Sequence, residues 1–171
     1  MDSVRRPSGL RFLENLAYLV PGYEGYKLRE RRQEEDSRLR ALVYERLLRL
    51  RQALDQIHDR WAEEEAGAQL EQLERRQMRL QTISEAVRYA PYASRAFFTS
   101  DSLEVQQIEQ ILETDLLILE DLYGAEEYLE RACVSVTPAP RTARAFFRAV
   151  DEDLGRLERH LIMREKVIAS T

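Results

Sequence analysis

The chain has 171 residues, of which 44% are hydrophobic and 33% charged, and its formal net charge is −5. This length is enough for one domain with a hydrophobic core, and the negative charge argues against a general polyanion binder. With only six glycines and five prolines, the chain has little material for turns, so it is predicted to form a few long helices and no sheet.

The first predicted element is a short helix over residues 10–20, which Pro21 and Gly22 bring to an end. We therefore expect residues 1–21 to form a short N-terminal helix and turn, and residues 22–171 to form a helical bundle.

Arg5, Arg6 and Arg11 precede or enter the apolar face of this first helix. That arrangement suits a helix lying on an anionic membrane surface. Glu14 and the short length of the helix favour the other interpretation, in which the helix docks onto the bundle.

A long helix is predicted from about Gly25 to Ala66, and it carries a heptad seam. The residues of this seam follow one another at spacings of 4-3-4-3-4: Val43, Leu47, Leu50, Leu54, Ile57 and Trp61. Asp36 and Ser37 leave open whether the helix is continuous, and Gly67 is its expected end. The shorter helix that follows is too polar to cover the seam, so we expect the chain to self-associate through it.

Three further helices are predicted, over residues 69–89, 102–134 and 141–168, with a loop over residues 135–140. Asp101 and Glu104 are expected to form a capping box at the start of the second of these. The predicted fold is therefore all-α, an antiparallel bundle of four main helices with coiled-coil-like heptad seams and a short N-terminal helix.

The stretch PGYEGYKLRERR, from Pro21 to Arg32, combines a Pro-Gly-Tyr turn, a second Gly-Tyr pair and a helix of mixed charge. It resembles a motif found in a group of uncharacterised prokaryotic helical proteins. The resemblance covers about a tenth of the chain, and it implies no activity, cofactor or site residue.

A metal site of the ferritin-like kind needs two Glu-x-x-His pairs from two helices and single carboxylates from two others. Only Asp55 and His58 have a comparable spacing, because Leu157 takes the matching position before His160. The sequence therefore predicts neither a metal nor another cofactor, and His58 is expected at the edge of the apolar stripe.

The basic residues between Lys27 and Arg40 raise the alternative of nucleic-acid binding, but acidic residues alternate with them. Opposite charges at helical spacing are typical of a solvated helix face. Nucleic acid is therefore not the expected partner.

Three charged residues stand at positions that should be apolar. Asp115 lies near the centre of the apolar arc of its helix, Glu126 lies three turns further along that arc, and Arg164 takes a seam position in the last helix. One hypothesis is a polar pocket that binds a ligand or supplies a catalytic acid. The favoured hypothesis is a buried Asp115–Arg164 pair that fixes helix register. A third hypothesis is a helix end that projects beyond the core.

The single cysteine, Cys133, excludes an intramolecular disulfide. The apolar stretch from Leu16 to Val20 is too short for a signal peptide, and no segment is long enough to span a membrane. These features predict a cytoplasmic protein. The expected function is a non-enzymatic interaction or scaffold protein that associates with a protein partner or with itself. The alternatives are a bundle with a ligand or metal pocket around Asp115, and a helical protein associated with a membrane surface or nucleic acid.

Overall fold

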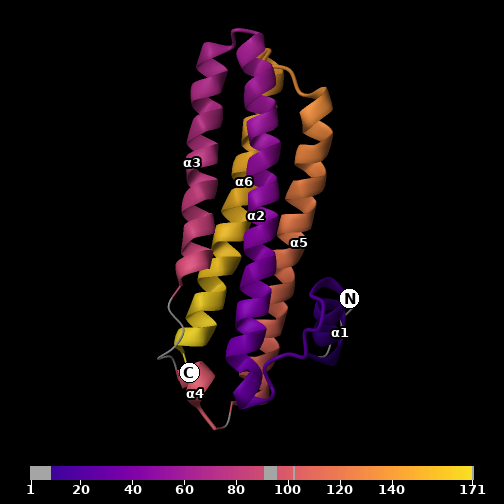
Figure 1. The fold of residues 1–171 in the computed structure, drawn as a ribbon, viewed down its shortest axis with the longest axis vertical. Coiled ribbons are helices and arrows are strands. Elements are labelled where there is room, and N and C mark those ends of the chain that lie inside the picture. Colours follow the sequence, from indigo (N-terminus) through magenta and orange to yellow (C-terminus); the bar gives the residue numbers. More distant parts are fainter. Residues whose placement is uncertain (1–8, 91–95, 102, 171) are drawn as a thin grey trace, which may run out of the picture. The chain divides into compact units, whose positions relative to one another are not determined.

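The computed structural model describes residues 9–90, 96–101 and 103–170, and 86% of these are helical, with no strand among them. The expectation of an all-helical chain is confirmed for this part (Figure 1). The helices are α1 (Gly9–Leu19), the 3-10 helix η1 (Arg29–Arg31), α2 (Arg32–Glu63), α3 (Gly67–Tyr89), α4 (Ala96–Thr99), α5 (Val105–Ser135) and α6 (Pro140–Ala169). No helix in the described part combines the length and apolar character that a membrane span requires.

The chain divides into two compact units. Unit 1 contains the described residues of Met1–Leu42, Pro91–Leu119 and His160–Thr171, and unit 2 contains Val43–Ala90 and Glu120–Arg159. The division falls inside α2, α5 and α6, and the expected boundary at residue 21 stays a prediction.

The long helix α2 starts later than the sequence predicts, at Arg32 instead of about Gly25. Gly22 and Gly25 have φ angles of 76° and 81°, in the left-handed region that glycine adopts without a steric penalty. A Cβ atom at Gly25 would also lie 2.8 Å from the side chain of Leu13. The chain therefore turns twice before the helix begins, and Asp36 does not interrupt the helix afterwards.

The end of α2 also differs from the prediction, because Gly67 is the first residue of α3 and does not terminate α2. The residue with a left-handed backbone in this turn is Glu65, whose φ angle is 54°. A residue with a side chain thus occupies the position where a glycine is usual.

The start of α5 lies three residues after the predicted one. The side chain of Gln107 accepts a hydrogen bond from the backbone N–H of Glu104 at 3.0 Å, which makes Glu104 the N-cap. Asp101, the expected cap, forms an ion pair with Arg29 instead.

In unit 2, side-chain contacts define which helical segments are neighbours and in which direction they run. Contacts between α2 and α3 pair later residues of one helix with earlier residues of the other. Asp55 contacts Gln77 at 2.7 Å, whereas Tyr44 contacts Arg88, so the two helices are antiparallel. The segments of α5 and α6 are antiparallel as well. In contrast, α2 and α5 run in the same direction, because Arg46 contacts Glu126 and Ala53 contacts Cys133.

The predicted seam of α2 is buried within the chain. All six of its residues, from Val43 to Trp61, are at most 2% exposed. Trp61 packs against Phe146 and Phe147 of α6, with ring centroids 5.8 Å apart in both pairs. The expectation that this seam remains exposed for self-association is therefore wrong, because helices other than α3 also cover it.

In unit 1, the core forms where the loop before α2 meets α4, α5 and the end of α6. Phe97 of α4 packs edge-on against Tyr26, with centroids 5.4 Å apart. Arg32, only 2% exposed, donates hydrogen bonds to the carbonyl oxygens of Tyr26, Phe97 and Ser100. This one guanidinium ties the loop and α4 to the first turn of α2.

Candidate functional site

Asp115 and Arg164 meet inside unit 1. Asp115 of α5 is fully buried, Arg164 of α6 is 3% exposed, and Nε of Arg164 lies 2.6 Å from Oδ1 of Asp115. Their helices present these side chains to the same core, as expected from the apolar stripes that both residues interrupt.

Arg164 has a second carboxylate partner that the sequence reasoning missed. Nη2 of Arg164 lies 2.5 Å from Oδ1 of Asp36, which is fully buried in the first turns of α2. Arg40, one turn further along α2, binds the other oxygen of Asp36 at 2.7 Å. Two arginines therefore balance two carboxylates.

Two tyrosines of the loop before α2 complete this buried network. The hydroxyl of Tyr26 donates to Oδ2 of Asp115 at 2.8 Å and accepts a hydrogen bond from Nη2 of Arg164 at 3.0 Å. The hydroxyl of Tyr23 lies 3.4 Å from the same carboxylate oxygen. The two Gly-Tyr pairs of the Pro21–Arg32 stretch therefore place two tyrosine hydroxyls within hydrogen-bonding distance of Asp115.

Burial dominates the electrostatics of the network. It raises the pKa of Asp115, an effect that Arg164 and Tyr26 partly offset. Burial alone would lower the pKa of Arg164, but the surrounding Asp115, Tyr26 and Asp36 raise it well above its usual value. Both oxygens of Asp115 accept hydrogen bonds from these partners, and the network connects α5, α6 and the loop before α2.

Glu126 lies in unit 2 and has partners of its own. Its carboxylate binds Arg46 at 2.8 Å and Arg49 at 3.7 Å, and its side chain is 12% exposed. The guanidinium of Arg46 also lies over the ring of Tyr123, 4.3 Å from its centroid. Glu126 is therefore part of a contact between α2 and α5.

His58 also lies in unit 2, at the edge of α2, with 29% of its side chain exposed. Its Nε2 is 3.6 Å from a carboxylate oxygen of Glu74, while Asp55 accepts a hydrogen bond from Gln77. Within the described residues no three His, Cys, Asp or Glu side chains are grouped so that they could hold a metal ion.

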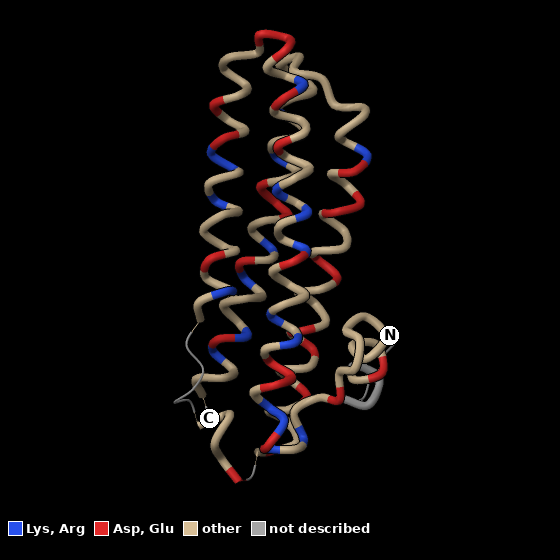
Figure 2. Tube along the Cα trace, viewed as in Figure 1, with Lys and Arg blue, Asp and Glu red and all other residues tan. Residues whose placement is uncertain are grey.

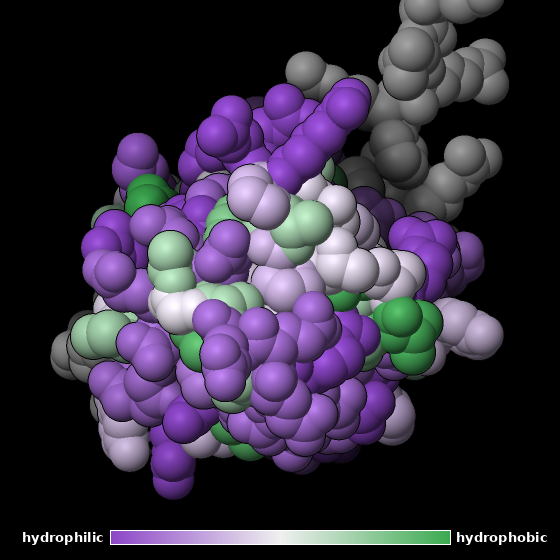
Figure 3. Space-filling view, turned by 90° about the horizontal axis from the view of Figure 1, so that it is seen from above, coloured by the Kyte–Doolittle hydropathy of each residue, from purple (hydrophilic) through white to green (hydrophobic). Residues whose placement is uncertain are grey.

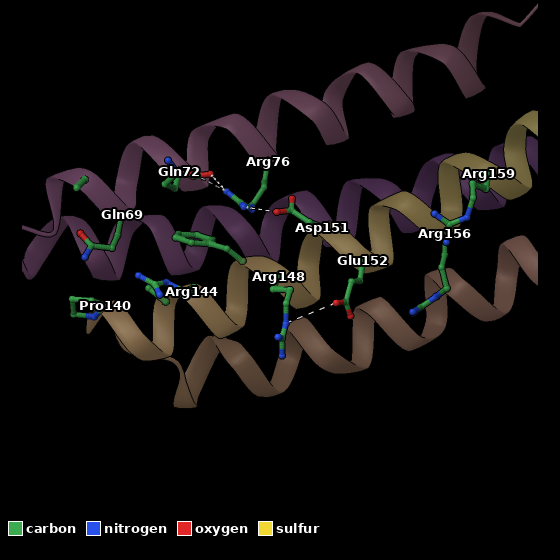
Figure 4. Close-up of a pocket in the computed structure, with 13 residues that line it drawn as sticks. Gln69, Gln72, Arg76, Pro140, Arg144, Arg148, Asp151, Glu152, Arg156 and Arg159 are labelled. Carbon is green, nitrogen blue, oxygen red and sulfur yellow. Dashed lines mark hydrogen bonds and ion pairs between the residues drawn. The ribbon is translucent and has the colours of Figure 1, made fainter.

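Unit 2 also has a surface groove between α3 and α6 that the sequence analysis did not identify (Figure 4). Its volume is about 1010 Å³. Five arginines and two carboxylates line it, an excess of three positive charges: Arg76, Arg144, Arg148, Arg156 and Arg159 against Asp151 and Glu152.

Some of these arginines are neutralised locally and others are not. Arg76 binds Asp151 at 2.5 Å, and Arg156 binds Asp153 at 2.5 Å. Among the described residues, Arg148 has one distant partner, Glu152, at 3.8 Å. Arg144 and Arg159 are exposed and form no hydrogen bond or ion pair with any residue in the described part of the chain.

The groove has a basic end, formed by the first turns of α6. Arg141 and Arg144 lie one turn apart there, and Arg148 follows one turn later, so all three share one helix face. They also border a second hollow, of about 420 Å³. Arg141, like Arg144, has no partner among the described residues.

Comparison of the chain with protein-family models, with curated proteins and with solved structures found no match.

Proposed function

We propose that this chain is a helical bundle acting as a non-enzymatic interaction protein, and that the groove between α3 and α6 binds an acidic segment of a protein partner. The proposal keeps the antiparallel bundle with heptad seams as the scaffold. It replaces the α2 seam by the groove as the binding surface, because the seam is buried.

The observation that carries the proposal is the run of three arginines at the start of α6, two of which, Arg141 and Arg144, have no partner among the described residues. Like charges one turn apart on a helix repel each other, and positive charges near a helix N-terminus oppose the helix dipole. Arg141 lies in the first turn of α6 and opposes the dipole, while Arg141, Arg144 and Arg148 follow one another at one-turn spacing, and no acidic residue stands in that first turn. An anionic partner would relieve this repulsion.

The chemistry of the groove suits carboxylates on a polypeptide. Guanidinium groups bind carboxylates through two parallel hydrogen bonds. Gln69 is half-buried, and its side-chain amide forms no hydrogen bond with a described residue, so this amide can bind a peptide backbone. Along α6, the groove extends from Pro140 to Arg159, which corresponds to about 28 Å, or about nine residues of extended peptide.

Nucleic acid fits the groove less well. Single strands are usually held by exposed aromatic rings on which the bases stack. The aromatic residue of the groove, Phe147, is 8% exposed, and the guanidinium of Arg76 lies 4.2 Å from its ring centroid.

The proposal is tested by fluorescence anisotropy with a labelled Glu-rich peptide, using a peptide of the same length with Gln in place of Glu as the control. We expect binding of the Glu peptide alone, and binding that weakens as salt is added. Changing Arg144→Gln and Arg159→Gln together should weaken binding by about tenfold or more, because each loses a charged hydrogen bond.

Arg131→Gln provides the matched control variant, since Arg131 is an exposed arginine of α5 outside the groove. It should leave the affinity unchanged. Equal binding of the Glu and Gln peptides, or tighter binding of a DNA strand than of the Glu peptide, would contradict the proposal.

A further inference from the structure

The turn between α2 and α3 presents three consecutive carboxylates, those of Glu63, Glu64 and Glu65, which we call the acidic turn. Figure 2 shows this turn as an acidic segment at the end of unit 2. All three residues are exposed, and their side chains form no hydrogen bond or ion pair with any described residue. The acidic turn is therefore free to meet a basic surface.

The backbone of the acidic turn is built at a conformational cost. Glu65 has a φ angle of 54°, a value that a side chain with a Cβ atom disfavours. A glycine at position 65 would adopt this φ angle without strain, but the residue there is a glutamate, which adds the third carboxylate of the turn.

The acidic turn and the basic end of the groove belong to the same end of unit 2. Ala68 and Gln69, which follow the turn directly in α3, line the groove together with Pro140 and Arg144 of α6. The two surfaces have opposite charge but make no ion pair with each other within one chain. This end of unit 2 therefore carries an acidic surface next to a basic surface of complementary charge.

Such a pair of surfaces is what a two-fold dimer requires, because an isologous interface makes every contact twice. We propose that two copies of this chain pair through this end of unit 2. The acidic turn of each copy enters the basic end of the other copy's groove and binds Arg141, Arg144 and Arg148. The inference rests on the proposed function of the groove and names the partner as a second copy.

The hydropathy of this end of unit 2 also favours an interface held by charge. Figure 3 views the molecule from this end and shows a mainly hydrophilic face with apolar residues in small, separate areas. An interface between such faces depends on ion pairs and weakens in salt.

The inference is tested by sedimentation velocity on two charge-reversed variants of the full chain. One variant carries Glu63→Arg, Glu64→Arg and Glu65→Arg. The other carries Arg141→Glu, Arg144→Glu and Arg148→Glu. The wild type should dimerise at low salt, and each variant alone should be monomeric, because its two surfaces then carry the same sign.

An equimolar mixture of the two variants should restore a dimer. In that pair, the reversed turn of one copy meets the reversed groove of the other, and the second contact keeps its original charges. Glu127→Arg with Glu130→Arg, two exposed acidic residues of α5, is the control that should still dimerise. Circular dichroism and Trp61 emission verify that every variant is folded.

A wild type that stays monomeric at all concentrations, or a mixture that stays monomeric, would overturn the inference. If that protein still binds the Glu-rich peptide, the inference fails and the proposed function stands, with another protein as the partner. If it binds neither a second copy nor the peptide, both fail.

Discussion

At the scale of single residues, the buried network of unit 1 is organised around Arg164. Its guanidinium lies between two buried carboxylates, Asp115 at 2.6 Å and Asp36 at 2.5 Å. Asp36 has Arg40 as a further partner, whereas the other partners of Asp115 in the described part of the chain are the hydroxyls of Tyr23 and Tyr26. The two members of the Asp115–Arg164 pair are therefore not equivalent.

This asymmetry predicts different losses of stability. Asp115→Ala should lower the free energy of unfolding by about 3 kcal/mol, because Arg164 keeps Asp36 as a partner. Arg164→Met should lower it by about 5 kcal/mol, at the upper end for a broken buried pair, because it leaves Asp115 charged without a cation. Urea denaturation followed by circular dichroism measures both.

The double variant Asp115→Leu with Arg164→Met should lose much less stability than the sum of the two single changes. Glu127→Ala serves as a control, since it breaks an exposed pair with Arg131 and should cost at most about 1 kcal/mol. Additive losses, or a larger loss for Asp115→Ala than for Arg164→Met, would refute this account of the network.

At the scale of elements, the turn between α2 and α3 makes a prediction about backbone strain. Glu65→Gly should stabilise the fold by about 1 kcal/mol, because glycine adopts a positive φ without the penalty that a Cβ atom imposes. Glu64→Gly removes the same charge from a residue without a positive φ, so it should not stabilise. Thermal unfolding of the two variants compares them directly, and equal effects would show that strain is not the cause.

The sequence predicts helices well and their ends less well. Apolar stripes at helical spacing are enough to locate α3, α5 and α6, because burial of one face dominates their energetics. The start of α2 depends on two glycine turns, and its end depends on a left-handed glutamate. Such local conformations leave no periodic signal in a sequence.

The same reasoning explains which members of the buried network were missed. Counting backwards from Val43 with the spacing of the seam leads to Arg40 and then to Asp36. Extending the heptad into the first turns of α2 therefore places both residues on the buried face. Tyr23 and Tyr26 carry no such signal, because they lie in an irregular loop.

At the scale of the whole molecule, charge is unevenly distributed. The chain has a net charge of −5, yet the groove between α3 and α6 has five arginines and two carboxylates among its lining residues. The groove could not be predicted from the sequence, because it requires knowing that α3 and α6 are neighbours and which faces they turn outward. Figure 4 shows that its arginines come from both helices.

The most direct test of the central claim, that this groove binds an acidic protein segment, is an NMR titration of the isotope-labelled chain with the Glu-rich peptide. Backbone amide signals should shift for the residues that line the groove at the start of α6 and in the first half of α3, and side-chain Nε–Hε signals should shift for Arg144 and Arg159. Arg131, on α5 outside the groove, should give an unchanged signal. Shifts confined to other surfaces, or no shifts at peptide concentrations that saturate the anisotropy signal, would contradict the claim.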